Sequence, residues 1–318
     1  MESILEAIEK GLAKCKIEIT KNLVYQIKNN DLAFKENLKK HLTQGNSSCF
    51  HTVVELDFNG LKDNKNKKSD LGVETIQFSE LNLTIKIWNS PIYIYGEYIK
   101  LSREMTQTPL KIKGKLKSQR SVSDFGEQFT KFFEASCFKF MGCGREDIDV
   151  RCLEGRPFIV EVSNPTININ SSSMDIELYD DIRIKNCYIA KKECKDFVNQ
   201  EDPSKFYNLL IYSNKRIEFQ KSYELEQKTP LRVLHRRADM VRTKTIEILK
   251  SEEIEDDGFY YEVIIKASSG AYIKEWVNGD FSRTNPNLNA DCLELDVITV
   301  DLNVNKDLLD RPLLLNIK

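Results

Sequence analysis

The chain has 318 residues, which at the usual ~100–200 residues per domain suggests about two domains. Its 47 Lys and Arg against 49 Asp and Glu give a net charge of −2 at pH 7, so any nucleic-acid-binding surface has to be local. Apolar runs are far shorter than the ~20 residues of a membrane-spanning helix, and no Gly-rich phosphate loop occurs, which predicts no membrane segment and argues against a nucleotide cofactor.

Cysteine and histidine do not have the spacing of a zinc site. The chain has 8 Cys and 3 His but no C-x-x-C pair, whereas structural zinc sites need ligands at roughly two-to-four-residue spacing. We therefore expect free thiols and no metal. The first residues, MESILEAIEKGLAKCKIE, interleave acids and bases and lack the apolar core of a signal peptide, so we expect an intracellular protein, cytoplasmic or nuclear.

The first 90 residues predict a small α+β domain. Amphipathic helices are expected over about residues 4–12 and 31–42, the second with Asn30 as its N-cap and Gly45 just past its end. Apolar and polar residues alternate over 54–58 and 81–87, which is the period of half-buried strands. Between these strands, residues 61–70 form a polar, basic stretch that predicts a loop.

A second domain is expected over residues 91–318, opening with a strand after Pro91. The segment KIKGKLK (111–117) then places four lysines at period two, so in an extended strand all four leave from one face. Such a face either contacts successive phosphates of a nucleic acid or belongs to an edge strand whose lysines prevent pairing with another strand. A helix is expected after Ser123, ending before residue 141, with a stripe of four Phe residues that belongs in the core.

After residue 150, strand signals outnumber helix signals. Strands are expected in PFIVEV (157–162), KFYNLLIYSNK (205–215), FYYEVIIKASSG (259–270) and near CLELDVITVDL (292–302), with one short helix in AYIKEWVNG (271–279). The predicted fold class is α+β with a mixed, mostly antiparallel sheet.

The densest charge cluster is GREDIDVR (144–151). A mixed-charge run of this kind is either a solvated turn or a loop that holds an Asp in a cleft. An Asp that acts as a nucleophile has to be ionised and oriented, which requires a cation partner. Arg145, Arg151 and Lys274 are the candidate partners in the sequence.

Three strings, in this order along the chain, resemble the motifs of pseudouridine synthases. GRED (144–147) resembles the catalytic loop that holds an Asp nucleophile, KFYNLL (205–210) resembles the K-x-Y motif, and KASSGAYIK (266–274) resembles the third motif. Longer strings, among them GREDIDVRCLEGRPFIVEVSNP and YIKEWVNGDFSRTNPN, are similar to the archaeal and eukaryotic tRNA pseudouridine synthase family called pseudouridine synthase ten. The resemblance covers about residues 91–300.

The resemblance implies a function and roles for individual residues. Members isomerise uridines 54 and 55 of the tRNA TΨC loop without a cofactor. By position, Asp147 matches the nucleophile, Tyr207 the tyrosine that stacks on the target uracil, and Tyr272 and Lys274 the third motif, where a basic side chain pairs with the nucleophile. Arg145 holds the loop or fills the space that the flipped base leaves. Asp149 would point the other way in an extended loop and is taken as structural.

The segment LRVLHRRADMVRTKT (231–245) is densely cationic, which predicts a phosphate-contacting surface that positions RNA. The segment supplies Arg232, His235, Arg236, Arg237, Arg242 and Lys244. Arg232, Arg236 and Arg237 are the candidate contacts, joined by Lys111 and Lys113 of KIKGKLK. The resemblance also implies that residues 1–90 are a reduced, THUMP-like RNA-binding domain without the family's zinc site, and that the protein is a monomer whose partner is tRNA.

Two alternatives come from other functional classes. One is a non-catalytic RNA-binding protein that remodels tRNA or processes small RNAs; retention of Asp147, an acid that would face anionic RNA, argues against it. The other is a cofactor-dependent RNA methyltransferase, disfavoured because no Gly-rich cofactor loop is present.

Overall fold

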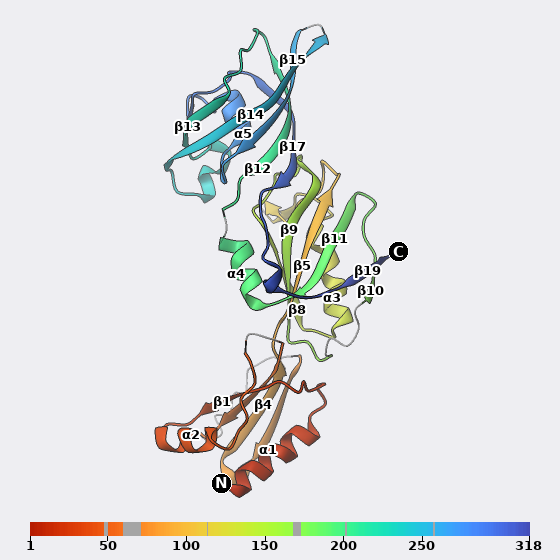
Figure 1. Ribbon diagram of the computed structural model, residues 1–318, viewed down its shortest axis with the longest axis vertical. Helices are drawn as coiled ribbons and strands as arrows, with labels where there is room; N and C mark the ends of the chain where they lie inside the picture. Colours follow the sequence, from red (N-terminus) through yellow and green to blue (C-terminus); the bar gives the residue numbers. More distant parts are fainter. Residues whose placement is uncertain (48–49, 60–70, 113, 168–172, 201, 257) are drawn as a thin grey trace.

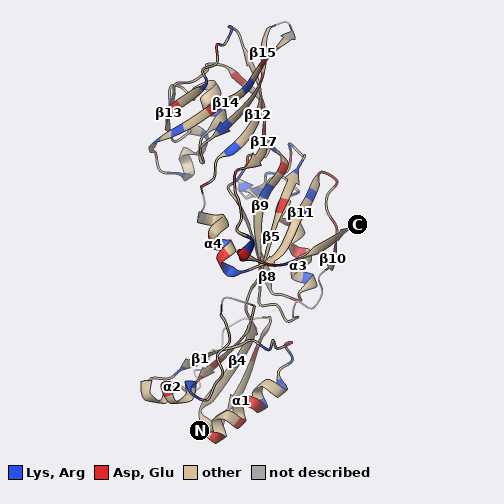
Figure 2. Ribbon diagram, viewed as in Figure 1, with Lys and Arg blue, Asp and Glu red and all other residues tan. Residues whose placement is uncertain are grey.

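The computed structural model describes residues 1–47, 50–59, 71–112, 114–167, 173–200, 202–256 and 258–318. These residues form three parts stacked along the long axis of the molecule, with the N-terminus at one end and the C-terminus beside the middle part (Figure 1). Basic and acidic residues are interspersed over all three parts (Figure 2), consistent with a net charge close to zero. None of the described helices is long and apolar enough to cross a membrane.

The N-terminal part is a four-stranded sheet with two helices. Its elements are α1 (Glu2–Lys14), β1 (Leu23–Lys28), α2 (Leu32–Lys39), β2 (Thr52–Asp57), β3 (Val73–Phe78), the 3₁₀ turn η1 (Ser79–Leu81) and β4 (Leu83–Asn89). The sheet order is β1-β2-β4-β3, with β1 and β2 parallel and the other neighbours antiparallel. The predicted helix at 4–12 and the predicted strands at 54–58 and 81–87 are confirmed as α1, β2 and β4, whose apolar faces pack together.

The second helix begins one residue later than predicted. Asp31, and not Asn30, is the N-cap of α2: its Oδ1 accepts a hydrogen bond from the backbone N–H of Phe34 at 3.1 Å. Asn29 Oδ1 in turn accepts from the backbone N–H of Asp31 at 2.7 Å, which fixes the entry to the helix. A carboxylate at this position also interacts favourably with the helix dipole. The predicted basic loop at 61–70 lies outside the described residues.

The middle and upper parts share one eleven-stranded sheet. The middle part holds β5 (Ile92–Lys100), β6 (Lys111–Ile112), β7 (Lys115–Leu116), η2 (Val122–Phe125), α3 (Gly126–Phe132), β8 (Cys137–Gly142), β9 (Arg151–Ser163), β10 (Ser173–Ile176), β11 (Ile182–Ala190), α4 (Lys192–Gln200), η4 (Lys306–Leu308), β18 (Leu309–Pro312) and β19 (Leu314–Ile317). The upper part holds β12 (Lys205–Ser213), β13 (Ser222–Lys228), η3 (Leu231–Arg236), β14 (Val241–Asp256), β15 (Gly258–Ala267), α5 (Ile273–Asn278), β16 (Thr284–Asn285) and β17 (Asp291–Val300).

The sheet runs in the order β16-β13-β14-β15-β12-β17-β9-β5-β11-β18, with β8 added on β9. Its neighbours are antiparallel except β17 and β9, which pair in parallel through only two residue pairs, Asp296 with Arg151 and Val297 with Cys152. The α+β, mostly antiparallel class predicted from the sequence is confirmed. The short parallel join is where the upper and middle parts diverge, and it lies beside the loop 144–150.

The helix expected after Ser123 is shorter than predicted. Ser121 and Asp124 form a capping box, η2 leads into α3, and the helix ends at Phe132. Glu134 has a φ of +45°, which helical residues do not adopt, and the alternating residues 137–142 then form β8. The helical pattern of the Phe residues ends at Phe133, the C-cap of α3, and pairing with β9 begins at Cys137.

KIKGKLK is a hairpin and not one extended strand. Gly114 has a φ of +80°, and the chain reverses there so that β6 and β7 pair. The prediction that four lysines leave from one continuous strand face is therefore wrong, because the only glycine of the segment is used as a turn. Lys111 and Lys115 are exposed on the two arms, and Lys113 lies outside the described residues.

Candidate active site

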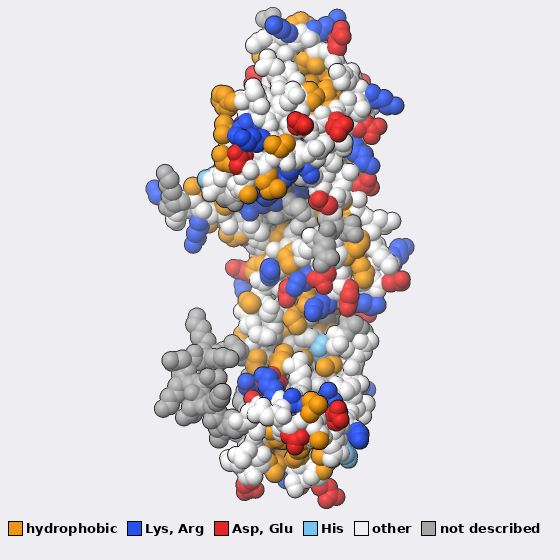
Figure 3. Space-filling model, turned by 90° about the vertical axis from the view of Figure 1, so that its left-hand side faces the viewer, with side chains coloured by type: hydrophobic (Ala, Val, Ile, Leu, Met, Phe, Trp, Pro, Cys, Tyr) orange, Lys and Arg blue, Asp and Glu red, His pale blue; other side chains and the backbone are white. Residues whose placement is uncertain are grey.

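A cavity of about 440 Å³ opens between the upper and middle parts. Its walls come from the loop 144–150, strand β12, the 3₁₀ turn η3, the start of β14 and the loop 269–272 that leads into α5. Figure 3 shows one face of the molecule, on which Lys and Arg side chains gather in the hollow between these two parts. The cavity thus joins all three strings that resemble pseudouridine synthase motifs.

Asp147 lies in the loop that leaves β8 and enters β9. Gly144 has a φ of +74°, a conformation that favours glycine, and the chain turns there into the cavity. The buried Lys100 donates hydrogen bonds to the carbonyl oxygens of Met105 (2.8 Å) and Ile148 (3.0 Å), which fixes the backbone beside Asp147. The Asp147 side chain remains 36% exposed in the cavity.

Two cations approach the Asp147 carboxylate from the opposite wall. Arg232 Nη1 lies 3.0 Å from Oδ1, and Lys274 Nζ lies 3.8 Å from Oδ2. Lys274 is closer to Asp149, to which it donates at 2.6 and 2.8 Å. Partial burial works to raise the pKa of Asp149, but the hydrogen bond and charge of Lys274 hold it below its usual value.

The expectation that Asp149 points away from the site is therefore wrong. The backbone N–H of Val150 bonds to the carbonyl oxygen of Asp147 at 3.2 Å, so the loop turns instead of running extended. In a turn, residues two apart reach the same side, and Asp147 and Asp149 share Lys274.

Arg232 is held in place by a second carboxylate. Its Nε donates to Glu275 Oε1 at 2.6 Å, and Glu275 is only 4% exposed. Burial works to lower the pKa of Arg232, but the hydrogen bond and charge of Glu275, followed by those of Asp147, raise it. The guanidinium also lies over the ring of Tyr272 at 6.0 Å. Arg232, which the sequence predicts to contact phosphate, thus links the candidate nucleophile Asp147 to helix α5.

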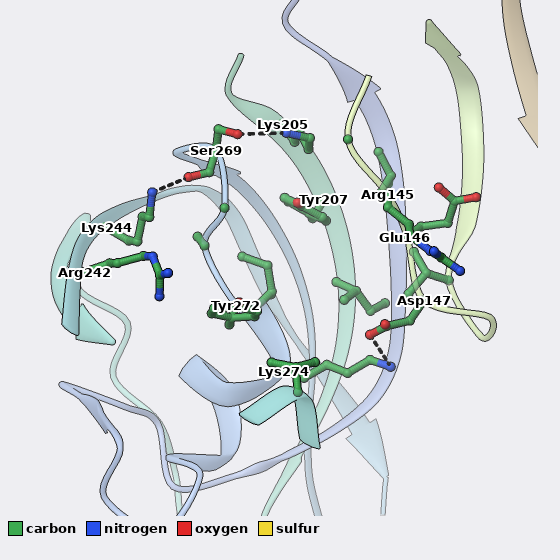
Figure 4. Close-up of a pocket in the computed structure, with 18 of the residues that line it drawn as sticks. Arg145, Glu146, Asp147, Lys205, Tyr207, Arg242, Lys244, Ser269, Tyr272 and Lys274 are labelled. Atoms are coloured by element: carbon green, nitrogen blue, oxygen red, sulfur yellow. Dashed lines mark hydrogen bonds and ion pairs between the residues drawn. The ribbon is translucent and has the colours of Figure 1, made fainter. Parts of the chain in front are cut away.

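Tyr207 and Tyr272 line the cavity from different elements (Figure 4). Tyr207 is on the central strand β12, and burial raises the pKa of its hydroxyl. Tyr272 precedes α5, and the buried Gln227 holds its backbone from both sides: the Tyr272 N–H donates to Oε1 and its carbonyl oxygen accepts from Nε2, each at 2.9 Å. The backbone that carries Tyr272 is therefore held in place at the cavity wall, and Tyr207 lies on a central strand of the sheet.

A buried polar network supports the Asp147 loop from behind. Glu146, the variable position of the GRxD string, pairs with Arg156 at 3.1 Å, with both side chains almost fully buried. Tyr98 and Gln107 also donate to Glu146 Oε2, at 2.8 and 3.2 Å. None of these residues was predicted from the sequence. The signal that could have found them is Arg156 directly before the apolar run Pro157–Val160 of β9, because an Arg that is buried with such a run requires an acidic partner.

The predicted site residues do not all gather in the cavity. Those that line it are Arg145, Asp147, Tyr207, Arg232, Arg237, Tyr272 and Lys274. Lys111 is exposed on the β6–β7 hairpin and does not line the cavity. Lys113 lies outside the described residues, and so does the side chain of Arg236. Among the residues that the structure describes, no group of three or more His, Cys, Asp or Glu is placed to hold a metal ion.

Comparison with known proteins matches residues 93–305 to the family described as "Pus10, C-terminal". The tRNA pseudouridine synthase Pus10 of Mus musculus is 36% identical over 247 residues, covering 70% of this chain and 46% of its own length. Its namesake from Methanocaldococcus jannaschii is 33% identical over 246 residues, covering 67% of this chain and 54% of its own. A solved Cbf5-Nop10-Gar1 complex aligns over 64% of the chain at 14% identity, but its TM-score of 0.33 is too low to support the fold.

The chain spans about half the length of the curated relatives that it matches. The matched region runs from β5 to the segment after β17, and so includes every wall of the cavity around Asp147. By the extent of this match and by identity above 30% to relatives from both eukaryotes and archaea, the chain belongs to the Pus10 C-terminal family.

Proposed function

We propose that this chain isomerises uridine to pseudouridine in the TΨC loop of tRNA, at position 55, position 54 or both, with Asp147 as the nucleophile and without a cofactor. The observation that carries the proposal is the placement of the Asp147 carboxylate inside a cavity, between Arg232 and Lys274 and facing two tyrosines. The relatives named above are called tRNA pseudouridine synthases, which supplies the substrate class.

The reaction needs only bond exchange within one nucleotide. Asp147 adds to C6 of the uracil or attacks C1′ of the ribose, and the N1–C1′ bond breaks. The detached base rotates and C5 bonds to C1′. The bond from Asp147 to C1′ breaks as this C–C bond forms, or the bond from Asp147 to C6 breaks afterwards, which regenerates the carboxylate. The proton on C5 is lost and N1 gains a proton, so substrate and product are isomers. Arg232 and Lys274 orient the carboxylate for this attack, since paired cations both attract it and fix its direction.

The two tyrosines suit a base that has left its stack. An unstacked base requires an aromatic face, and such contacts contribute ~1–3 kcal/mol per base in single-stranded sites. Tyr207 stacks on the uracil in this proposal, and its hydroxyl assists removal of the C5 proton. Tyr272, with Arg232 over its ring, bounds the other side of the base.

RNA outside the cavity is proposed to contact the cationic residues predicted from the sequence. Arg236, Arg237, Lys111 and Lys113 contact the RNA backbone, and Arg145, which lines the cavity, holds the loop or fills the space that the flipped base leaves. Residues 1–90 act as an accessory, THUMP-like RNA-binding domain, and the enzyme works as an intracellular monomer.

Position-resolved pseudouridine mapping tests the proposal. Unmodified tRNA is incubated, without added cofactor, with the wild-type protein and with Asp147→Asn, which keeps the shape of the side chain and removes the nucleophile. Asp175→Asn, at an exposed ion pair with Lys318, serves as the matched control. We expect product in the TΨC loop with wild type and control only. Binding of tRNA without product from any of the three would favour the non-catalytic RNA-binding protein instead.

A further inference from the structure

Three basic side chains line the end of the cavity away from Asp147. Lys205 comes from the start of β12, and Arg242 and Lys244 come from β14. Figure 4 shows Lys205 and Lys244 converging on Ser269, with Tyr207 and Tyr272 lying between this cluster and Asp147. The cavity therefore has an acidic end and a cationic end, with aromatic rings between them.

The hydrogen bonds of the three cations go to uncharged atoms. Lys205 Nζ donates to Pro203 O at 3.2 Å and to Ser269 Oγ at 3.4 Å. Lys244 Nζ donates to Ser269 O at 2.6 Å, and Arg242 Nη1 donates to a threonine hydroxyl at 3.1 Å. Within the described part of the chain, none of the three forms an ion pair, although Asp202 also lines this end.

This arrangement differs from a solvated lysine surface. Lys205 is only 7% exposed, and burial, followed by the charge of the buried Arg156, lowers the pKa of its ammonium group. Like charges that line one end of a partly buried cavity repel one another, and an anion bound among them offsets this repulsion. The cations at the Asp147 end have carboxylate partners, and these three do not.

The cluster is also open to a ligand. Gly270, directly after Ser269, has a φ of +69°, and a Cβ there would be in van der Waals contact with Lys244 Nζ, at 3.4 Å. A residue other than glycine would have a strained backbone here, and its side chain would lie beside the ammonium group. Glycine leaves that approach free, as expected where a substrate comes close to the backbone.

We propose that Lys205, Arg242 and Lys244 bind one backbone phosphodiester of the RNA, next to the target uridine. A phosphodiester carries one negative charge and two free oxygens, so it can accept from a lysine on one oxygen and from the arginine on the other. The nucleotide is then held at both ends, with its phosphate at the cationic cluster and its sugar–base bond at Asp147. This inference rests on the proposed function, because it names the part of the substrate that this end of the cavity binds.

Single uncharged linkages test the proposal. A TΨC stem-loop RNA is prepared with a methylphosphonate at one linkage at a time around the target uridine, and its affinity is measured for wild type and for Lys244→Gln. The matched control is Lys250→Gln, on the same strand and paired with Glu252 at the surface. Lys205→Gln is the second variant, and thermal unfolding of each variant verifies that it folds.

We expect one neutral linkage beside the target to weaken binding to wild type and to Lys250→Gln about 10-fold, as for loss of a charge-assisted hydrogen bond. The same linkage should cost Lys244→Gln measurably less than it costs wild type, because one of the three contacts to the phosphate is already absent. The slope of log affinity against log salt should also fall by about 1 in Lys244→Gln. If every linkage costs wild type and Lys244→Gln the same, the subsite is overturned.

Pseudouridine formation on the unsubstituted RNA is measured as well, so that failure of the phosphate subsite can be distinguished from failure of the proposed reaction. Wild type that makes pseudouridine but shows no coupling between a linkage and Lys244 would overturn the phosphate subsite alone. Coupling in the binding measurement without product from wild type would support the subsite and overturn the proposed reaction.

Discussion

At the scale of single residues, the candidate site depends on how Arg232 divides its hydrogen bonds. Nε binds the buried Glu275 at 2.6 Å, and Nη1 binds Asp147 at 3.0 Å. The two bonds leave from different nitrogens of one planar group, so the guanidinium fixes the direction of the Asp147 carboxylate relative to α5. A lysine keeps the charge but cannot make both bonds in fixed directions.

Arg232→Lys is therefore expected to lower kcat about 10-fold while the protein stays folded. The ammonium group can neutralise Glu275, and the carboxylate of Asp147 loses its oriented partner. Arg232→Gln should additionally reduce the free energy of unfolding by about 2 kcal/mol, because it leaves Glu275 buried without a cation. Single-turnover kinetics and urea unfolding of both variants provide the measurements. Equal kcat in wild type and Arg232→Lys would show that Arg232 does not orient the nucleophile.

Only part of this site could be predicted from the sequence. Asp147, Tyr207, Tyr272 and Lys274 were found because each lies inside a short recognisable string, and the structure brings all four to one cavity. The Arg232 to Asp147 bond joins residues 85 positions apart, and the Lys274 to Asp149 bonds join residues 125 apart. Pairings of this range depend on the whole fold, and no local pattern in the chain encodes them.

At the scale of elements, the cavity depends on the short parallel join of β17 to β9. Asp296 on β17 is almost fully buried and accepts from the backbone N–H, Nε and Nη2 of Arg151 at 3.2, 3.0 and 2.6 Å. Arg103 also donates to Asp296 at 3.0 Å and to the carbonyl oxygen of Asp149 at 2.8 Å. One carboxylate thus holds both strands together and, through Arg103, anchors the Asp147 loop.

Asp296→Asn is expected to reduce the free energy of unfolding at pH 7 by about 2 kcal/mol, because Arg103 and Arg151 lose their buried counterion and keep only the exposed Glu294. Burial works to raise the pKa of Asp296, but Arg151 and Arg103 hold it below its usual value. A depressed pKa gives stability that is present above the unfolded-state pKa of ~3.9 and lost as the pH falls through the folded-state value. The difference between wild type and variant should therefore shrink below about pH 4.

Urea unfolding at a series of pH values from 7 to 3 provides the measurement for Asp296. Asp301→Asn is the control, since Asp301 makes an exposed ion pair with Lys266 and should change stability by less than about 0.5 kcal/mol. A constant difference between wild type and Asp296→Asn across this pH range would contradict the role of the carboxylate at the join.

Elements were predictable where one local signal acted alone. The strand at β12 and the helix at α5 carry such signals, and the structure has both. The helix predicted from the Phe stripe extended into residues 137–142, which instead pair with β9 as strand β8. In KIKGKLK the period-two lysines favoured one extended strand, whereas the chain turns at Gly114. Partner strands distant in sequence decide between such competing signals.

At the largest scale, the buried apolar residues that the structure describes form two separate clusters. One cluster holds residues of α1, α2, β2 and β4, and the other holds residues of the middle and upper parts. Among the described residues, few hydrogen bonds join the N-terminal part to the rest; examples are the Glu18 N–H to Thr166 O at 3.1 Å and Asn89 Nδ2 to Pro165 O at 3.3 Å. Separate cores with few joining bonds favour local unfolding of one part without the other.

Matched substitutions in the two clusters should therefore act separately. Leu56 and Leu225 are both fully buried, the first in β2 and the second in β13, and Leu→Ala at such sites costs about 2–5 kcal/mol. Leu56→Ala should accelerate native-state hydrogen exchange in β2 and β4 and leave β13 and β14 unchanged, and Leu225→Ala should do the reverse. If either substitution accelerates exchange equally in both regions, the two cores unfold as one cooperative unit, and residues 1–90 cannot be treated as a domain of their own.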